Sequence, residues 1–418
     1  MKIIWIAYDR QKYLGGPIIN TIRVLPEFVL RGHDVWALIG HDGSGHPSTD
    51  ILEKKGVKCI PYKINYYSED DVKFILLQIS IIQPDVFISN ISTPGAFAGY
   101  WIKKWGIPVI HSQRGDDALN NGAATYFFNG PKKWRLDGLM SVNPFLLKKV
   151  LPNHNEKIIT KIIPSGVPVP NFKKNINLTK ELRIIYSGRF VQRIKRIQDI
   201  LSVFVSLANQ NPYLYFTFLG SGDLLLLEEM KQQVLDQQLE NRIFFKETLL
   251  GEAYKEELCL HDVIVLLSES EGTPGSILDG MSCGLVPIVY NTYGIEFLIK
   301  DKINGFIVND RREHFMNTIL SLQKDKKKRE DIGIEARNTI IENFSLSKTT
   351  DLWEEFFIEI HAYKKYKGKF KIPKIIKLPK NNKLLVQHIC KPDILEKINF
   401  FIRRNDKIPY LKEKLKNL

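Results

Sequence analysis

Two acidic residues flank the start of a predicted helix in the segment Ser268–Pro287. Glu271 stands just before the helix, and Asp279 lies about one and a half turns inside it, ~7 Å further along the axis. Between them, free backbone N–H groups and the positive end of the helix dipole attract an anion. The segment therefore offers a phosphate seat beside two carboxylates, which suits a ligand that carries hydroxyl groups and a diphosphate. The alternative is that the two acids only complement the helix dipole.

A basic cluster follows the predicted strand Leu182–Tyr186. Gly188 permits a tight turn there, and Arg189 and Lys195 could reach the same anion. The strand before Glu271 belongs to the same α/β series, so both clusters are expected at one edge of one parallel sheet. A solvated basic loop is the alternative interpretation.

Three further loops follow predicted strands. Gly15 and Gly16 would let backbone N–H groups approach a ligand closely, although a plain turn uses such a pair more often. Arg114 and Asp117 follow another strand and are candidates for ligand contacts, or equally for structural roles. The glycine pair in 220–222 lacks the third glycine of the dinucleotide fingerprint, which argues against a nicotinamide site.

The composition excludes several classes of protein. The chain has 418 residues, 44% of them hydrophobic and 25% charged, which is typical of two or three globular domains. Its four cysteines form no CxxC pair, and no Asp-x-Asp or HExxH motif occurs, so neither a disulfide framework nor a protein-held metal is indicated. No apolar run is long enough for a signal peptide or a membrane-spanning helix, so we expect a cytoplasmic protein.

Short apolar strands alternate with helices along most of the chain, a pattern typical of parallel sheets covered by helices on both faces. A segment with three prolines in seven residues, 164–170, separates two such series and predicts a linker. We therefore predict an α/β fold with two Rossmann-like, doubly wound domains that face a cleft, where the carboxyl ends of strands bind ligands. The predicted divisions are residues 1–165, 166–345, a helix at 346–363, and a basic tail at 364–418. The predicted strands are Ile3–Tyr8, Asp34–Ile39, Val86–Ser89, Val109–Ser112, Leu139–Val142, Leu182–Tyr186, Leu214–Leu219, Ile243–Lys246, Val263–Leu267 and Pro287–Tyr290.

Nearly all of the net charge of +14 lies in the tail. Residues 364–418 carry a net charge of +13, which leaves +1 for the rest of the chain. Residues 366–379 interleave lysines with apolar side chains, and residues 392–404 are also apolar and basic. Such segments bind anionic membrane surfaces at roughly 1 kcal/mol per basic residue near the surface. A solvated or loosely packed tail is the alternative, and no nucleic-acid motif is present.

These motifs resemble those of the family-4 retaining glycosyltransferases of GT-B fold, over roughly residues 1–345. Glu271 and Asp279 correspond to the E-x7-E pair of that family. The pattern S-x-x-E-G-x-P…L-x-x-M-x-x-G-x-P is matched by Ser268, Glu271, Gly272, Pro274, Leu278, Met281, Gly284 and Pro287. Further matches, in the expected order, are Gly15-Gly16, Arg31-Gly32-His33-Asp34-Val35, Pro164-Ser165-Gly166-Val167, Gly188-Arg189 with Lys195, Gly220-Ser221-Gly222 and Asn304-Gly305. Three positions depart from the family pattern: the second acid is Asp279 rather than Glu, Lys195 follows Arg189 by six residues, and Arg114 replaces the His that many members place before Gly-Asp.

The resemblance implies a role for each of these residues. Arg189 and Lys195 would hold the donor diphosphate, and Glu271 would bind hydroxyls of the donor sugar; these three form the expected catalytic group. Asp279 would bind the nucleotide ribose, and Arg114 and Asp117 are candidate sugar or acceptor contacts. The remaining donor-binding positions are Gly15, Gly16, Gly188, Gly272, Thr273 and Pro274.

The activity implied is transfer of a sugar, with retention, from a nucleotide-diphosphate sugar to a glycan or lipid-linked acceptor, in the synthesis of cell-surface polysaccharide or lipopolysaccharide. Such an enzyme needs no metal and no cofactor besides its nucleotide-sugar co-substrate, and works in the cytoplasm or at the inner face of the membrane. The helix at 346–363 resembles the one that crosses back to the first domain in this fold. Two alternatives share the scaffold: a sugar-nucleotide epimerase and a non-catalytic sugar-nucleotide-binding protein.

Overall fold

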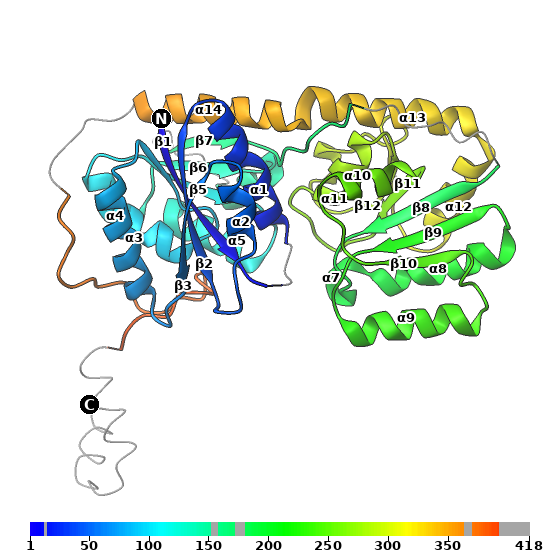
Figure 1. Ribbon diagram of the computed structural model, residues 1–418, viewed down its shortest axis with the longest axis horizontal. Helices are drawn as coiled ribbons and strands as arrows, with labels where there is room; N and C mark the ends of the chain where they lie inside the picture. The colour runs from blue at the N-terminus through cyan, green and yellow to red at the C-terminus, as the bar shows by residue number, and fades with distance from the viewer. Residues whose placement is uncertain (12–14, 152–157, 172–179, 363–369, 393–418) are drawn as a thin grey trace, which may run out of the picture.

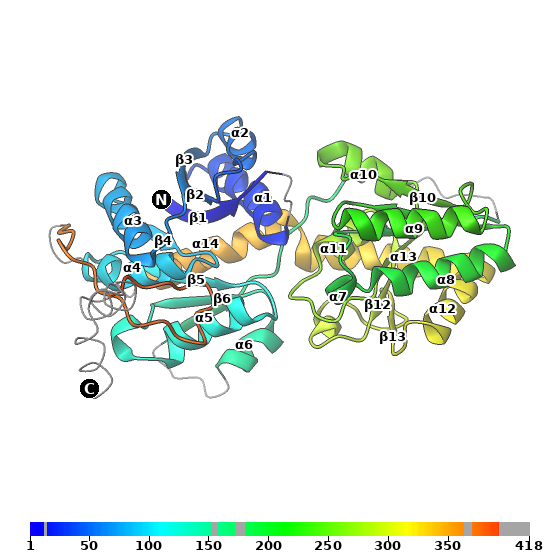
Figure 2. The same ribbon diagram turned by 90° about the horizontal axis from the view of Figure 1, so that it is seen from below.

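Two parallel β-sheets, each covered by helices, form the two domains of the computed structural model (Figure 1). The structure describes residues 1–11, 15–151, 158–171, 180–362 and 370–392. The two domains lie side by side along the long axis in both views, and a row of helical segments between residues 326 and 362 runs from one to the other (Figures 1 and 2). This architecture confirms the predicted α/β fold with two domains.

The first domain is built on a seven-stranded sheet with the order β3-β2-β1-β4-β5-β6-β7. All its strand pairs are parallel, so each connection crosses over through a helix or loop. The strands are β1 (Lys2–Asp9), β2 (Asp34–His41), β3 (Lys58–Lys63), β4 (Val86–Ile88), β5 (Val109–Gln113), β6 (Gly138–Ser141) and β7 (Ile159–Ile162). The helices are α1 (Gly16–Leu30), α2 (Ser48–Glu53), α3 (Ser68–Ile82), α4 (Thr93–Lys104), α5 (Ala118–Asn129) and α6 (Pro144–Val150).

The second domain repeats this plan on a six-stranded parallel sheet with the order β10-β9-β8-β11-β12-β13. Figure 1 shows α9 below this sheet and α13 above it. The strands are β8 (Leu182–Ser187), β9 (Leu214–Leu219), β10 (Ile243–Lys246), β11 (Val263–Leu266), β12 (Val286–Tyr290) and β13 (Phe306–Val308). The helices are α7 (Gln192–Lys195), α8 (Ile197–Gln210), α9 (Leu224–Asp236), α10 (Gly251–Cys259), α11 (Gly275–Ser282), α12 (Glu313–Lys324) and α13 (Lys326–Thr339).

The chain crosses between the domains twice, and the two crossings are hydrogen-bonded to each other. Val167 donates its N–H to the Phe344 carbonyl at 3.0 Å, and Leu346 donates to the Val167 carbonyl at 2.8 Å. Gly166 fits here because a Cβ would lie 2.6 Å from the Thr349 hydroxyl oxygen. The two segments that connect the domains, the proline-rich linker and the start of α14 (Leu346–Ala362), therefore lie side by side and are hydrogen-bonded to each other.

Helix α14 returns to the first domain and packs against α1 and β1. Trp353 meets the ring of Trp5 edge to face, with centroids 5.1 Å apart, and Phe357 contacts Phe28. Trp5 and Trp353 are fully buried, so this seam belongs to the core of the first domain. Burying aromatic rings of this size is among the largest contributions a single contact makes to stability.

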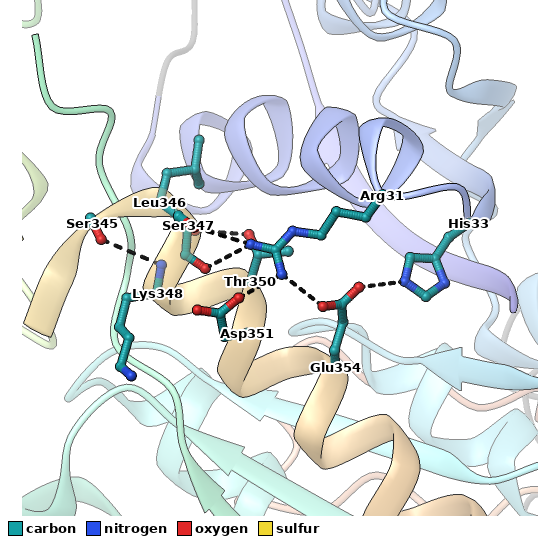
Figure 3. Close-up of polar contacts among 9 residues, drawn as sticks. All are labelled: Arg31, His33, Ser345, Leu346, Ser347, Lys348, Thr350, Asp351 and Glu354. Carbon is teal, nitrogen blue, oxygen red and sulfur yellow. Dashed lines mark hydrogen bonds and ion pairs between the residues drawn. The ribbon is translucent and has the colours of Figure 1, made fainter. Parts of the chain in front are cut away.

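A polar cluster fixes the solvent edge of the same seam (Figure 3). The Arg31 guanidinium pairs with Asp351 at 2.6 Å and with Glu354 at 2.7 Å, while His33 Nε2 lies 2.7 Å from the second oxygen of Glu354. Arg31 also donates to the Ser347 carbonyl at 3.0 Å. Burial alone would raise the pKa of Glu354, but the hydrogen bonds from His33 and Arg31 outweigh it and lower that pKa. The turn after α1 therefore clamps the first two turns of α14.

Residues 370–392 wrap along the outer side of the first domain (orange in Figure 1). Phe370 packs on Trp105 with ring centroids 5.1 Å apart, and Leu385 is only 2% exposed. His388 bonds Ser68, and Ser68 donates its N–H to the Ile389 carbonyl at 2.9 Å, which occupies the start of α3. The apolar side chains that the sequence offers to a membrane thus mostly contact the protein itself: Phe370, Ile372, Ile376 and Leu378 pack on the core, whereas Ile375 is exposed. The apolar, basic stretch at 392–404 lies almost wholly outside the described residues.

We expect Glu354→Gln to lower the free energy of unfolding by about 1 kcal/mol at neutral pH, since it removes the charge that two cations share. In thermal unfolding this is a fall in Tm of about 2–4 °C. The folded-state pKa of Glu354 is depressed below its ordinary 4.5. The stabilisation is therefore present above about pH 4.5 and is lost as the pH falls through the depressed value.

Glu355→Gln is the matched control on the next residue of α14. Glu355 pairs with Lys161 at 2.9 Å, but its side chain is 56% exposed against 28% for Glu354. The control should shift Tm by less than half as much. An equal loss in both variants, or a Glu354→Gln loss that does not shrink as the pH falls below 4.5, would contradict the role given to this cluster.

Candidate functional site

The carboxyl edges of the two sheets meet at the junction between β11 and α11. Gly272 lies so close to the first domain that a Cβ would be 2.2 Å from the Arg114 carbonyl oxygen. Asn143 donates its side-chain N–H to the Gly272 carbonyl at 2.7 Å, and Thr273 donates to the Val142 carbonyl at 3.4 Å. Because Arg114 follows β5 and Val142 follows β6, the ends of two first-domain strands hold the loop in front of α11.

Glu271 and Lys195 lie side by side, as expected for loops at one sheet edge. Lys195 Nζ donates to Glu271 Oε1 at 2.5 Å, and each side chain is only 16% exposed. Tyr186 lies beneath them: burial raises the pKa of its phenol, and the charge of Glu271 adds to the effect. The Tyr186 hydroxyl donates to the Arg189 carbonyl at 2.7 Å and so fixes the loop that carries Arg189, an exposed side chain.

The glycine pair at 220–222 supports the loop that contains Gly188. A Cβ at Gly220 would lie 2.0 Å from the Gly188 carbonyl oxygen, and one at Gly222 would lie 2.4 Å from the Phe190 carbonyl oxygen. Phe190 donates its N–H to the Ser221 carbonyl at 2.9 Å. The pair therefore allows two backbone segments to pack closely, a role that the sequence analysis did not assign to it.

Asp279 is nearly buried inside α11 and is paired across the domain interface. Arg23 of α1 donates from one Nη2 to both carboxylate oxygens of Asp279, each at 3.0 Å. Burial raises the pKa of Asp279, and Arg23 opposes this rise. The carboxylate that the resemblance assigns to a ribose is thus held by an arginine of the other domain.

The first-domain candidates have mixed positions. Gly15 caps α1, and Gly16 has open space around its Cβ position. Arg114 lies at the junction just described. Asp117 caps α5 by accepting from the Asn120 N–H at 2.9 Å, which gives it a structural role. His111, earlier in the same segment, is fully buried, and burial lowers its pKa to about 4.

Arg23 and Asn143 were missed by the sequence analysis. Both lie in the first domain and contact the 271–279 segment of the second. No local pattern marks them, because they follow no motif and their partners are more than 120 residues away.

A small hollow adjoins the junction within the second domain. Its walls are Glu271, Gly272, Thr273 and Pro274 on one side and Thr292, Tyr293, Gly294, Ile295, Phe297 and Leu298 on the other. Helix α11 starts here, and its first N–H groups have no acceptor within the helix. Among the described residues, no group of three His, Cys, Asp or Glu side chains is arranged to hold a metal ion. The junction thus combines a cation, a carboxylate and a helix amino terminus, which suits an anionic ligand with hydroxyl groups.

Two parallel-sheet domains with such a junction define the GT-B class. The chain superposes on Anabaena HepE, solved in complex with UDP and glucose, with a TM-score of 0.69, 16% identity, and coverage of 86% of this chain and all of that one. A glycosyltransferase from Rickettsia africae matches equally well, with a TM-score of 0.69, 20% identity, and coverage of 86% and 98%. Residues 169–339 match the family model for glycosyl transferases group 1.

Sequence comparison gives relatives that have assigned activities. The UDP-Gal:alpha-D-GlcNAc-diphosphoundecaprenol alpha-1,3-galactosyltransferase of Escherichia coli is 31% identical over 215 residues, which are 48% of this chain and 54% of that protein. The N-acetyl-alpha-D-glucosaminyl L-malate synthase of Bacillus anthracis is 24% identical over 219 residues, 50% of this chain and 55% of that protein. The chain thus spans about half the length of these relatives.

We expect Gly272→Ala to break the contact between the domains, because the new methyl group would collide with the Arg114 carbonyl. Such overpacking destabilises a contact by typically 1–3 kcal/mol, unless the two domains move apart. Small-angle scattering should show a larger radius of gyration, and hydrogen exchange should rise at 142–143.

Gly275→Ala is the control three residues away. Nothing lies within 4 Å of its Cβ position, so its scattering should equal that of the wild type. If Gly272→Ala also left both measurements unchanged, the contact at Gly272 would not hold the domains together.

Proposed function

We propose that this protein is a retaining glycosyltransferase that moves a sugar from a nucleotide-diphosphate sugar to a glycan or lipid-linked acceptor. The Lys195–Glu271 pair at the amino end of α11 carries the proposal. Lysine supplies charge to a diphosphate, the carboxylate accepts from sugar hydroxyls, and the helix start adds N–H donors. The family match of the second domain and the GT-B fold support it.

In this proposal the donor diphosphate binds Lys195 and displaces Glu271 from the ion pair that the two residues form. Bond cleavage leaves extra negative charge on the nucleoside diphosphate, which Lys195, Arg189 and the α11 N–H groups would stabilise; removing one such group costs roughly 3–4 kcal/mol in the barrier. Glu271, released from Lys195, then accepts hydrogen bonds from the hydroxyl groups of the sugar. The departing phosphate deprotonates the acceptor on the same face, so that the anomeric configuration is retained. The domain contact at Gly272 excludes water and so limits hydrolysis of the donor.

The acceptor class follows from the relatives, not from the site. The Escherichia coli relative is named for a diphosphoundecaprenol acceptor, and a 24% identical Staphylococcus aureus relative is named for poly(ribitol-phosphate). Both names denote phosphate-bearing acceptors. We therefore propose a role in the synthesis of a cell-surface polysaccharide or lipopolysaccharide.

Glu271→Gln should reduce transfer at least 100-fold in a protein that is still folded, because it removes the carboxylate charge with little change in shape. Lys195→Ala should reduce kcat similarly and should also weaken binding of the nucleoside diphosphate. Transfer is measured as nucleoside diphosphate released with a membrane extract as acceptor, across UDP-, GDP-, ADP- and dTDP-sugars. Product analysis separates transfer from epimerisation.

Glu252→Gln and Lys231→Ala are the matched controls, since both side chains are exposed and lie on other helices. They should retain wild-type rates. Wild type that binds a nucleotide sugar but transfers it to no acceptor would favour a non-catalytic binding protein, and an epimerised product would favour an epimerase.

We also propose that the described part of the tail adds affinity for an anionic membrane. Residues 370–392 contain six lysines and no acidic residue. Their apolar side chains mostly face the domain, whereas Lys371, Lys374, Lys377, Lys380 and Lys383 are exposed. The segment would therefore lie on a negatively charged surface without inserting into it. None of the described helices is long and apolar enough to cross a membrane.

A triple change of Lys371, Lys374 and Lys377 to Gln should lower the affinity for phosphatidylglycerol vesicles at least tenfold, at roughly 1 kcal/mol per lysine. Changing the exposed Lys231, Lys302 and Lys327 of the second domain serves as a charge-matched control. Cosedimentation at low and high salt measures both. Binding that is insensitive to salt, or that falls equally in the control, would contradict the role of this segment.

A further inference from the structure

Arg114, a half-buried arginine with no acidic partner among the described residues, directly follows β5. Arg114 Nε donates to the Asn90 side-chain oxygen at 2.7 Å, and the guanidinium lies over the ring of Trp5, 5.5 Å from its centroid. Arg114 Nη2 is buried and has no hydrogen-bond partner among the residues that the structure describes. Burial lowers the pKa of Arg114 to about 9, and no carboxylate opposes the shift. A buried charge of this kind is costly unless something pairs with it.

Other unpartnered polar atoms lie on the same face of the first sheet. Ile110 of β5 packs in the core layer under α1 and α14, and strand alternation puts Ser112 on that face as well. The Ser112 hydroxyl and the Asn20 side-chain oxygen of α1 are buried and lack partners in the described part of the chain. A guanidinium nitrogen, a hydroxyl and an amide oxygen thus remain without partners in one layer, at the end that faces the second domain.

The position of Arg114 places this group beside the candidate site. Its carbonyl oxygen is the atom that Gly272 approaches, and Gly272 follows Glu271 in the chain. Arg189 and Lys195 belong to the second domain, and the first-domain Arg23 is already paired with Asp279. Arg114 therefore supplies positive charge from the opposite side. A guanidinium differs from a lysine here because its planar fork matches the two oxygens of a carboxylate or phosphate.

We propose that Arg114 binds an anionic group of the nucleotide sugar from the first-domain side, either a carboxylate on the transferred sugar or an oxygen of the diphosphate. In the same layer the Ser112 hydroxyl would donate to the ligand, and the Asn20 oxygen would accept from one of its hydroxyl groups. The inference rests on the proposed function, because it presumes that a nucleotide sugar occupies the junction. It extends that function by assigning a charge requirement to the donor.

The test compares ligand pairs that differ only at the sugar. Calorimetry with UDP, UDP-glucose and UDP-glucuronate, and with GDP, GDP-mannose and GDP-mannuronate, is performed on the wild type and on Arg114→Gln. If the anion is the sugar carboxylate, Arg114→Gln should weaken the uronate at least tenfold and leave the neutral sugar nucleotide and the diphosphate unchanged. If the anion is the diphosphate, all ligands of the preferred base should weaken by a similar factor.

Thermal unfolding without ligand separates a binding role from a structural one. Since the charge is buried without an acidic partner, Arg114→Gln should keep or raise the Tm of the free protein. Arg114→Lys keeps the charge without the fork and should restore only part of the affinity. Arg135→Gln, a partly buried arginine elsewhere in the first domain, should leave binding unchanged.

Ligand affinities that stay unchanged in Arg114→Gln, with or without a fall in Tm, would overturn the inference while leaving the proposed function intact. Wild type that binds none of these six ligands, nor any ADP- or dTDP-sugar, would instead contradict the proposed function, and the inference with it.

Discussion

The packing of a backbone loop against a carbonyl group decides how the two domains meet. At Gly272 there is no room for a side chain, since even a Cβ would collide with the Arg114 carbonyl oxygen. This contact, together with the hydrogen bond from Asn143, brings the carboxyl edge of the first sheet to the amino end of α11. Parallel sheets present their ligand-binding loops at that edge. The approach of this glycine therefore helps to bring the first-domain groups of the site next to those of the second domain.

The charged side chains at this junction form ion pairs with each other before any ligand binds. Lys195 holds Glu271 within the second domain, while Arg23 holds Asp279 across the interface. Each pair is largely shielded from water, so separating its members without a substitute is costly. In the proposed mechanism the substitute is the donor itself, whose phosphates replace Glu271 at Lys195 and whose hydroxyls replace Lys195 at Glu271. Such an exchange favours ligands that carry both kinds of group, because a ligand with only one leaves a charge unpaired.

The sequence predicted the elements that have strong local signals. The strand predicted at Leu182–Tyr186 and the helix predicted at about 346–362 were found within one residue of their ends, because a long apolar run or a regular aromatic pattern defines them. Strands β3, β7 and β13 were missed; β3 and β7 carry no fully buried apolar run, and β13 has only three residues. The short helix α7 and the break between it and α8 were not predicted, because Arg196 adopts a left-handed backbone conformation that the sequence does not signal.

The site shows the same division between local and distant information. The proximity of Lys195 and Glu271 was predictable, because strands β8 and β11 are adjacent and their loops share an edge. The pairing of Arg23 with Asp279 was not, because it depends on the rotation between two domains, to which residues far away contribute. The polar cluster of Arg31, His33 and Glu354 contributes to this rotation, because it holds α14 against α1.

The tail illustrates a related limit. Alternating lysine and apolar residues define an amphipathic segment, but not whether lipid or protein covers its apolar side. Here Phe370 and Leu385 pack on the first domain, and Ser68 at the start of α3 donates its backbone N–H to the Ile389 carbonyl. These contacts are made by apolar side chains and backbone groups. The side chains of Lys371, Lys374, Lys377, Lys380 and Lys383 therefore stay exposed. Packing of the segment on its own domain therefore keeps its charge available to an anionic surface.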